Sequence, residues 1–292
     1  MQTLKNFTLS VLAKVLVKTF SRWIKYFRGI STQIIISRHI KCIITANLLR
    51  GNFFIVQNVI AKCENWLREQ VSNARANGII LGLSGGIDSS VLAALGREAL
   101  GKSGVLGVIM PCYSIDEDEA DARLLAEKFD ISFKLVNLSG VYDAILDSLG
   151  EEIITLAKSN LKARLRMMTL YALGQNKNFL VCGTSNKSEY ETGYFTKYGD
   201  SGVDLMPLAS FLKRDIREIA KILNVPEKII NKAPSAGLYQ GQTDESDMGF
   251  TYEILDEYLS SGNITDSKAR ERIDVMRRRS EHKRQPIPIF KF

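Results

Sequence analysis

Residues 79–90 read IILGLSGGIDSS, and this stretch decides the fold. It opens with an apolar run that is too short for a helix and is typical of a buried strand. Serine and glycine then form a turn, and helical character continues through residues 91–100. The stretch therefore predicts a buried strand, a tight turn and a helix, in that order.

The same alternation continues along the chain. Helical spacing occurs at residues 55–75, 116–129 and 153–174, and further short apolar runs occur at residues 105–110, 133–136 and 179–182. Strands that alternate with helices predict an α/β fold, a doubly wound parallel sheet with helices on both faces. No internal repeat or low-complexity linker divides residues 53–292, so we expect one domain there. Ligands of such sheets bind beyond the carboxyl ends of the strands, which points to the turns after the first and fourth predicted strands.

The basic charge of the chain is concentrated at its N-terminus. The net charge is +7, but residues 1–52 hold nine lysines and arginines and no acidic residue. The total of 39 basic residues therefore leaves 30 in the remainder, against 32 acidic ones. A body of nearly balanced charge gives no electrostatic reason to bind nucleic acid.

Residues 1–52 are interpreted as an extension that is not part of the fold. No apolar run within them approaches the length of about 18 residues that a membrane span needs. Two explanations stay open: a misassigned start of the coding sequence, which we favour slightly, and a targeting segment. The four cysteines of the chain share no CxxC spacing, which argues against a zinc site or a disulfide framework and fits a reducing compartment.

The turn at residues 84–89 has the chemistry of a phosphate-binding loop. Its two glycines let the backbone bring N–H groups close to an anion, and the following helix points its N-terminus at the same place. Phosphate repels Asp88 unless a cation lies between them, so this residue predicts Mg²⁺. The alternative is a simple turn in which Asp88 caps the helix. The spacing matches neither a Walker A loop nor a dinucleotide-binding fingerprint.

This loop resembles the SGGxDS motif of the N-type ATP pyrophosphatases, which hydrolyse ATP between its α- and β-phosphates. The second half of the chain resembles one family within that group, the NAD synthetases. The resemblance covers roughly residues 55–290, and its motifs are ARLR at 163–166, GTSNKSE at 183–189, GYFTKYGD at 193–200, MPL at 206–208, KR at 213–214 and EHKR at 281–284. It implies an adenine nucleotide alpha hydrolase-like fold.

The resemblance also implies an activity. It is the adenylation by ATP of the carboxylate of nicotinic acid adenine dinucleotide (deamido-NAD), followed by conversion to the amide of NAD with ammonia. Residues 1–52 are too short for the glutamine-hydrolysing domain of related enzymes, so ammonia is expected to be free or to come from a separate protein. The family further implies a cytoplasmic homodimer, with neither a nucleic-acid nor a membrane partner.

The site residues follow from the same resemblance. Asp88 and Glu189 would hold Mg²⁺, and Lys213 would contact the phosphates of ATP, so these three are the expected catalytic residues. The ATP site would comprise Gly82, Leu83, Ser84, Gly85, Gly86, Ile87, Asp88, Ser89, Thr184, Lys213 and Ser235. Ser235 stands where the family usually has threonine, and it keeps the hydroxyl. Deamido-NAD would be held by Arg164, Lys197, Asp204, His282 and Lys283.

Two other functions stay open. Another N-type pyrophosphatase, such as a tRNA-modifying enzyme, would be expected to have a basic body or catalytic cysteines. A module that binds ATP without chemistry would be expected to lack Asp88 or Glu189. Neither pattern is seen, and no base for the ammonia step can be named from the residues.

A candidate lid follows Ser235. Residues 237–249 read GLYQGQTDESDMG and have no hydrophobic period, so we expect an irregular loop. By closing over ATP, such a loop would exclude water from the adenylate.

Overall fold

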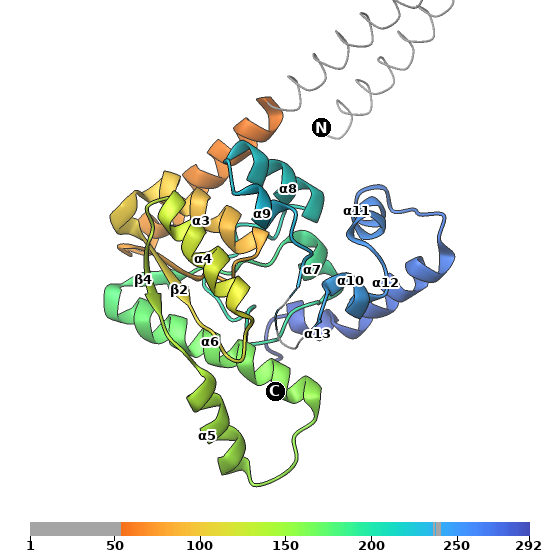
Figure 1. The fold of residues 1–292 in the computed structure, drawn as a ribbon. Coiled ribbons are helices and arrows are strands. Elements are labelled where there is room, and N and C mark those ends of the chain that lie inside the picture. The colour runs from red at the N-terminus through yellow and green to blue at the C-terminus, as the bar shows by residue number, and fades with distance from the viewer. Residues whose placement is uncertain (1–53, 236, 238–240) are drawn as a thin grey trace, which may run out of the picture. The chain divides into compact units, whose positions relative to one another are not determined.

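The computed structural model describes residues 54–235, 237 and 241–292 (Figure 1). One compact unit runs from Val56 to Phe292. The predicted extension, residues 1–52, lies outside the described residues. The described part begins with a helix over residues 54–73, close to the predicted helix at residues 55–75.

A four-stranded parallel sheet organises this unit. Its strands are β1 (Gly78–Gly82), β2 (Val105–Ile109), β3 (Ser132–Leu135) and β4 (Phe179–Val181), each close to its predicted bounds. The spatial order is β3-β2-β1-β4, so the chain moves outward from β1 and later returns to its other side. The switch point of the sheet therefore lies between β1 and β4, where ligands of this fold class bind.

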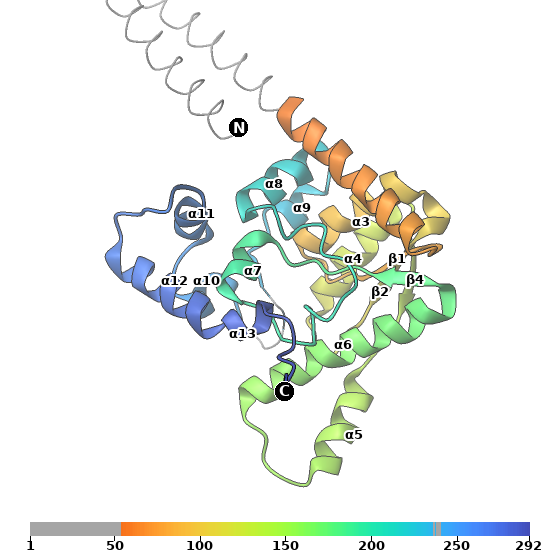
Figure 2. The same ribbon diagram turned by 180° about the vertical axis from the view of Figure 1, so that it is seen from behind.

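Helices cover both faces of the sheet, as the alternation of elements predicts (Figure 1, Figure 2). Those of the first half are α3 (Ile87–Leu100), α4 (Asp116–Lys128), α5 (Ser139–Leu149) and α6 (Thr155–Lys177), with a 3₁₀ turn at Lys102–Gly104. Helix α5 is absent from the predicted elements, and only Tyr142 of its residues is buried. Helix α3 begins at Ile87 rather than near residue 91, which places Asp88 in its first turn.

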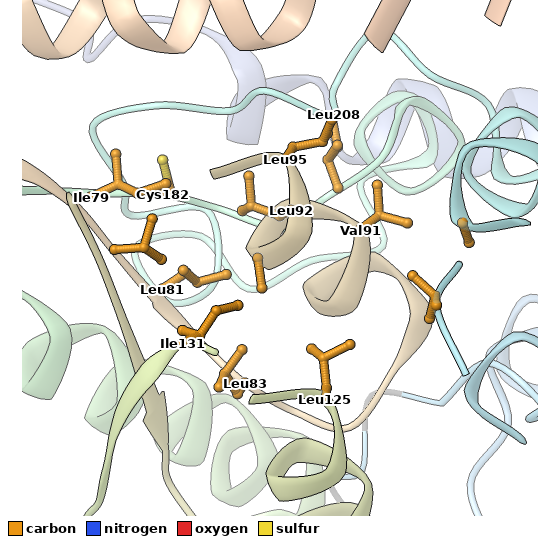
Figure 3. Close-up of a cluster of buried hydrophobic side chains, with 14 of the residues drawn as sticks. Ile79, Leu81, Leu83, Val91, Leu92, Leu95, Leu125, Ile131, Cys182 and Leu208 are labelled. Atoms are coloured by element: carbon orange, nitrogen blue, oxygen red, sulfur yellow. The ribbon is translucent and has the colours of Figure 1, made fainter. Parts of the chain in front are cut away.

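Alternating side chains along β1 divide the core of the sheet in two. Ile79 and Leu81 point to one face, where they pack with residues of α3 and α4 such as Leu92 (Figure 3). Ile80 points to the other face and packs with Val181 and with residues of α6. Because both faces are covered, the strand residues are buried whichever way they point, and the sequence shows a continuous apolar run. Each such side chain stabilises the fold by about 1.5–3 kcal/mol relative to exposure.

The chain after β4 is mostly helical. Its helices are α7 (Lys187–Thr192), α8 (Lys213–Ile222), α9 (Glu227–Ile230), α10 (Asp244–Met248), α11 (Tyr252–Ser261), α12 (Ser267–Arg279) and α13 (Glu281–Arg284). Helices α11 and α12 pack against α7, and Tyr252, Leu255 and Ile273 form part of a separate buried cluster there (Figure 2). Helix α7 therefore joins the edge of the sheet to this second helical group.

The prediction of an irregular loop over residues 237–249 is wrong at its C-terminal end, where α10 forms. Thr243 starts this helix, since its side chain accepts a hydrogen bond from Ser246 N. Gly249 ends it in the left-handed conformation, with a φ of 78°. A helix this short is set by its caps rather than by a hydrophobic period. Residues 238–240 lie outside the described part, so the lid stays a prediction.

Candidate active site

A cavity of about 980 Å³ opens at the carboxyl ends of the strands. The turn after β1, the segment after β4, the start of α8 and one face of α6 all contribute to its wall. The cavity therefore lies where the strand order places a ligand site.

The turn after β1 is held by its own side chains. The hydroxyl oxygens of Ser84 and Ser89 lie 3.0 Å apart, and Ser89 Oγ donates to Gly86 O at 2.9 Å. Gly85 has a φ of 74°, and a Cβ at this position would lie 2.4 Å from Asp118 O. Only glycine suits this conformation, which directs the N-terminus of α3 at the cavity. A helix N-terminus stabilises an anion such as phosphate.

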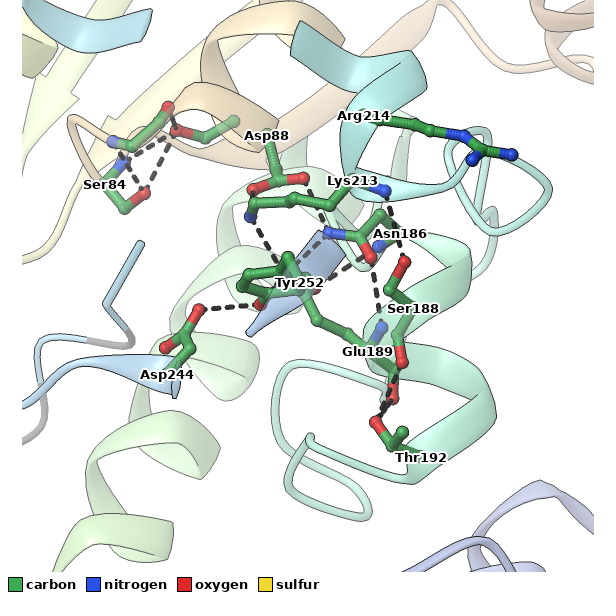
Figure 4. A network of polar contacts seen from close by, with 12 residues as sticks. Ser84, Asp88, Asn186, Ser188, Glu189, Thr192, Lys213, Arg214, Asp244 and Tyr252 are labelled. Atoms are coloured by element: carbon green, nitrogen blue, oxygen red, sulfur yellow. Dashed lines mark hydrogen bonds and ion pairs between the residues drawn. The ribbon is translucent and has the colours of Figure 1, made fainter. Parts of the chain in front are cut away.

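Asp88 does not cap α3, so the alternative interpretation of this residue is wrong. Gly86 is the N-cap residue, and no side chain caps the helix there. The carboxylate of Asp88 instead faces α8, and its Oδ2 lies 2.5 Å from Lys213 Nζ (Figure 4). The same Nζ lies 3.3 Å from Glu189 Oε1, so one ammonium joins the two carboxylates.

Asn186 clamps the same two carboxylates from the other side. Its Nδ2 donates to Asp88 Oδ1 at 2.9 Å and to Glu189 Oε1 at 2.7 Å. Its Oδ1 accepts from Glu189 N at 3.0 Å and completes a capping box at the start of α7. Asn186 is fully buried, so one side chain both starts the helix and fixes the orientation of the acidic pair.

Lys213 is held at the first residue of α8. Its N–H donates to Ser188 Oγ at 3.1 Å, and Ser188 in turn donates to Asp256 at 2.5 Å. Asp256 also accepts from Arg214 N at 2.8 Å and so stabilises the N-terminus of the helix. The ammonium of Lys213 lies 4.9 Å from the ring centre of Tyr252. These contacts compensate for the burial of a lysine that is only 2% exposed.

The acidic groups of this cluster outnumber its single ammonium. Burial raises the pKa of Glu189 to about 8, and the charge of Asp88 acts in the same direction while Lys213 opposes it. Burial alone would lower the pKa of Lys213, but the attraction of Asp88 and Glu189 outweighs it and raises that pKa. Burial also raises the pKa of Asp244. The acidic groups thus resist ionisation, and a further cation would stabilise their charged forms.

The donor set fits Mg²⁺, which prefers oxygen ligands and commonly takes one or two carboxylates together with phosphates. Asp88 and Glu189 are close enough to share one cation. Nearby, Asp244 Oδ2 accepts from Tyr252 OH at 2.9 Å, while its buried Oδ1 has no hydrogen-bond partner. A buried acceptor without a partner is rare and suggests a missing ligand. Within the described residues, no group of three or more His, Cys, Asp and Glu forms a metal site, so phosphates and water would complete the shell.

The residues expected to bind ATP lie on the cavity wall, with one exception. Those on the wall are Gly82, Leu83, Ser84, Gly86, Ile87, Asp88, Ser89, Thr184, Lys213 and Ser235. Gly85 instead packs against α4 at Asp118 O. Ser235 is exposed, and its Oγ accepts a hydrogen bond from Gly237 N at 3.1 Å.

Of the residues expected to bind deamido-NAD, Lys283 is the member that lies on the cavity wall. Its ammonium donates to Gly193 O at 2.8 Å and to Phe195 O at 2.7 Å. Burial lowers the pKa of Lys283. The other expected members, which lie outside the wall of this cavity, are Arg164, Lys197, Asp204 and His282.

Three of these four outer residues contact one another. Arg164 is exposed and donates to Lys197 O at 3.3 Å, and Lys197 Nζ donates to His282 O at 2.8 Å. Asp204 lies apart from them and accepts from Val181 N at 2.8 Å, on the free side of β4. Within one chain, the structure therefore does not bring these four side chains to the cavity.

Several residues of the site were not found from the sequence. Asn186 follows Thr184 in a segment already assigned to ATP, so its position after the fourth strand was an available signal. Asp244 and Tyr252 carry no such signal, because their roles depend on contacts with a segment far away in the chain. A further omission is Arg166, which lies on the cavity wall two residues after Arg164.

The strand order, the glycine-rich turn after β1 and the acidic pair define the class: a nucleotide-binding enzyme of the adenine nucleotide alpha hydrolase-like fold. Within that class the chain belongs to the NAD synthase family, which residues 59–287 match.

Individual relatives agree with this assignment. The chain is 49% identical over 238 residues to the NH(3)-dependent NAD(+) synthetase of Finegoldia magna, which covers 80% of this chain and 98% of the relative. The match to the enzyme of the same name from Carboxydothermus hydrogenoformans is 48% over 228 residues, covering 77% and 93%.

Two solved structures share the fold over nearly their whole length. One is the NMN synthetase from Francisella tularensis, with a TM-score of 0.78, 40% identity and coverage of 81% of this chain and 99% of that one. The other is the NH3-dependent NAD synthetase from Campylobacter jejuni, with a TM-score of 0.68, 31% identity and the same coverage of 81% and 99%.

Proposed function

We propose that the cavity binds ATP and deamido-NAD together and that they form an acyl-adenylate beside Asp88, Glu189 and Lys213. The overall reaction is the ATP-dependent amidation of deamido-NAD to NAD with ammonia, so the chain is a ligase that forms a carbon–nitrogen bond. The observation that supports the route through an acyl-adenylate is the single ammonium shared by two carboxylates next to the phosphate-binding turn.

In the first step, the substrate carboxylate attacks the α-phosphorus of ATP and pyrophosphate leaves. A carboxylate is already a nucleophile at neutral pH, so this step needs no general base. Positioning and neutralisation of phosphate charge carry it instead. The N-terminus of α3 offers N–H groups to the phosphates. Mg²⁺ held by Asp88 and Glu189 would supply further positive charge at the phosphate oxygens.

Lys213 is proposed to exchange partners during binding. In the free enzyme it is the counter-ion of Asp88 and Glu189. With nucleotide bound, its flexible side chain donates to the phosphates. The two carboxylates then keep their positions, because both remain bonded to Asn186. A module that had lost its chemistry would have no reason to retain this buried, charged arrangement, whose burial is unfavourable by itself.

In the second step, ammonia attacks the carbonyl carbon of the acyl-adenylate. The bond from this carbon to the phosphate oxygen breaks, the attacking nitrogen loses a proton, and NAD, AMP and the proton are released. We propose that ammonia is taken up free, in line with the ammonia-dependent relatives.

A second copy of the chain is proposed to cover the exposed face of α6. Met168 on this face is 60% exposed, and Arg164 lies four residues before it, so the two share the face. Helix α5 packs beside α6 and exposes Val141 and Leu149. Adjacent exposed apolar side chains are typical of protein interfaces. Pairing here would bring Arg164 to the partner's dinucleotide, which explains why it lies outside the cavity of its own chain.

Sedimentation of the purified protein tests the dimer. We expect the wild type to be a dimer and Met168→Glu to be a monomer with reduced kcat/KM for deamido-NAD. Leu124→Glu is the matched control, because Leu124 is also an exposed apolar residue but lies on α4. A monomeric, fully active wild type would contradict the proposal.

Residues 1–52 are proposed to lie outside the catalytic fold, since the family match begins at residue 59. The cytoplasm is the proposed compartment, because Cys63, Cys112 and Cys182 are buried free thiols, as expected under reducing conditions. Separately, no helix in the described part of the chain is both long and apolar enough to cross a bilayer. A chain that starts at residue 53 should keep the kcat and melting temperature of the full protein; loss of either would contradict the boundary.

One assay tests the activity itself. The enzyme is supplied with ATP, Mg²⁺, deamido-NAD and ammonium, and the products are separated by chromatography. AMP, pyrophosphate and NAD in equal amounts are expected, and formation of ADP would contradict the route. Because one structural relative is an NMN synthetase, nicotinic acid mononucleotide is the competing acceptor. A larger kcat/KM for that mononucleotide would reassign the substrate within the same reaction.

A further inference from the structure

Arg166 reaches across the cavity wall from α6 to the segment that follows β2. Its Nε donates to Met110 O at 3.2 Å, and its Nη2 donates to Ser114 Oγ at 3.3 Å. The residue is half-buried and lies on the cavity wall. Arg164, two residues earlier, is exposed and lies outside the wall, so the two arginines of this motif point to different surroundings.

The charge of Arg166 has no counter-ion in the described part of the chain. Four basic residues line the cavity: Arg166, Lys213, Lys232 and Lys283. Lys213 is paired with Asp88, and Lys232 lies 2.8 Å from Asp118. The described carboxylates form no ion pair with Arg166, although Asp118 and Asp200 act on its charge from further away. Its two hydrogen-bond acceptors, a carbonyl and a hydroxyl, are both neutral. Burial lowers its pKa, but a guanidinium stays protonated in proteins.

A half-buried cation with neutral partners is unfavourable unless a ligand compensates for it. A guanidinium carries five N–H donors in a planar fork, and the contacts above use only part of them. Such a fork matches carboxylate and phosphate oxygens better than any other group in proteins. The contacts to Met110 and Ser114 hold the guanidinium plane in a fixed orientation, as a binding residue requires.

Arg166 shares the cavity with two parts of its wall, which are the phosphate-binding turn after β1 and the segment of α6 together with Lys283. These parts would hold ATP and deamido-NAD respectively. The two reacting groups, a carboxylate and a phosphate, are both anionic and must approach each other, which requires positive charge where they meet.

We propose that Arg166 binds an oxyanion at the reacting centre, either the carboxylate of deamido-NAD or the α-phosphate of ATP. The proposal rests on the function proposed above for this cavity. It makes Arg166, rather than Arg164, the arginine of the motif that acts on ligands bound to its own chain.

The binding of three ligands to the wild type and to Arg166→Gln tests this assignment. Deamido-NAD and NAD differ in that one carries a carboxylate where the other carries an amide, and AMP supplies the α-phosphate. Calorimetry gives the three dissociation constants in the full-length protein. Arg97→Gln is the control, because Arg97 pairs with Asp130 and lies off the cavity wall. We expect Arg97→Gln to bind all three ligands as the wild type does.

Two results would support the proposal and identify the oxyanion. If Arg166 holds the carboxylate, Arg166→Gln weakens the binding of deamido-NAD by roughly tenfold or more and weakens the binding of NAD much less. If Arg166 holds the α-phosphate, the binding of AMP weakens by roughly tenfold or more instead. Arg166→Lys, which keeps the charge but loses the fork, should fall between the wild type and Arg166→Gln.

Unchanged affinity of Arg166→Gln for all three ligands, within about twofold, would overturn the proposal and leave Arg166 as a structural link to Met110. Arg166→Met serves in the same comparison if thermal unfolding shows that the glutamine variant does not fold. Wild-type exchange of pyrophosphate into ATP, dependent on deamido-NAD, is measured in parallel. Absence of this exchange would count against the acyl-adenylate route itself, whereas the ligand affinities test only the role of Arg166.

Discussion

Lys213 Nζ lies 2.5 Å from Asp88 Oδ2, although 125 positions of the chain separate the two residues. Glu189 shares the same nitrogen at 3.3 Å, and Asn186 is bonded to both carboxylates. This contact joins α3, the helix after β1, to the first residue of α8 across the switch point of the sheet. The free enzyme thus neutralises its acidic pair with its own lysine, and four expectations follow.

Lys213→Met should destabilise the metal-free enzyme. Removal of one partner leaves uncompensated buried carboxylates, which typically costs about 3–5 kcal/mol. Added Mg²⁺ should then stabilise the variant more than the wild type, because the cation no longer competes with the ammonium. Urea unfolding with and without Mg²⁺ measures both effects. Equal stabilisation of the two proteins by Mg²⁺ would mean that metal and lysine do not share the acidic pair.

Asn186→Ala should lower the affinity for Mg²⁺ more than it lowers the stability of the fold. Loss of a residue that orients metal-binding carboxylates typically lowers affinity by about 10- to 100-fold. Loss of the helix cap costs about 1 kcal/mol. Thr251→Ala is the matched control, because Thr251 caps α11 in the same way without touching the acidic pair. Titration of the reaction rate with Mg²⁺ compares the variants, and equal Mg²⁺ dependence in both would refute the orienting role.

Glu189→Gln should change how stability depends on pH. The folded protein raises the pKa of Glu189 from 4.5 to about 8, so it binds the proton more tightly than the unfolded chain. This contribution is fully present below about pH 4.5 and is lost as the pH rises through 8. Its slope is about 1.4 kcal/mol per pH unit within that window.

Metal-free unfolding between pH 5 and pH 8 checks this expectation. The wild type should lose stability more steeply than Glu189→Gln, because groups common to both proteins cancel in the difference. Parallel curves for the two proteins would show that Glu189 is already ionised in the fold.

Gly85→Ala should raise the KM for ATP and destabilise the fold. An added Cβ would lie 2.4 Å from Asp118 O, and the φ of 74° is itself unfavourable for alanine. Gly150→Ala is the matched control, with a φ of 65° but nothing within 4 Å of the added Cβ. It should cost about 1–2 kcal/mol of stability and leave KM unchanged. Equal KM values for both variants would show that the turn after β1 tolerates the displacement.

The elements of the fold were largely predictable because short-range patterns encode them. The strands that flank the site were found from apolar runs bounded by turns, and Asp88 and Glu189 were found from motifs next to those strands. The start of α3 and the whole of α10 were not, since no hydrophobic period marks either of them. The arginine on the cavity wall, Arg166, was not singled out, because the resemblance pointed to Arg164 and the spacing of a helix does not say which side faces a cavity.

By itself, the sequence determined the alternation of strands and helices, the turn after the first strand and the edge of the sheet at which the cavity opens. These features depend on neighbours within a few residues, which constrain the backbone directly. Only the tertiary structure decided which charges meet: Lys213 with Asp88, Asn186 with both carboxylates, and Arg166 with no counter-ion in the described chain. Electrostatic attraction and hydrogen bonding depend on distance through space, and separation along the chain does not reveal that distance.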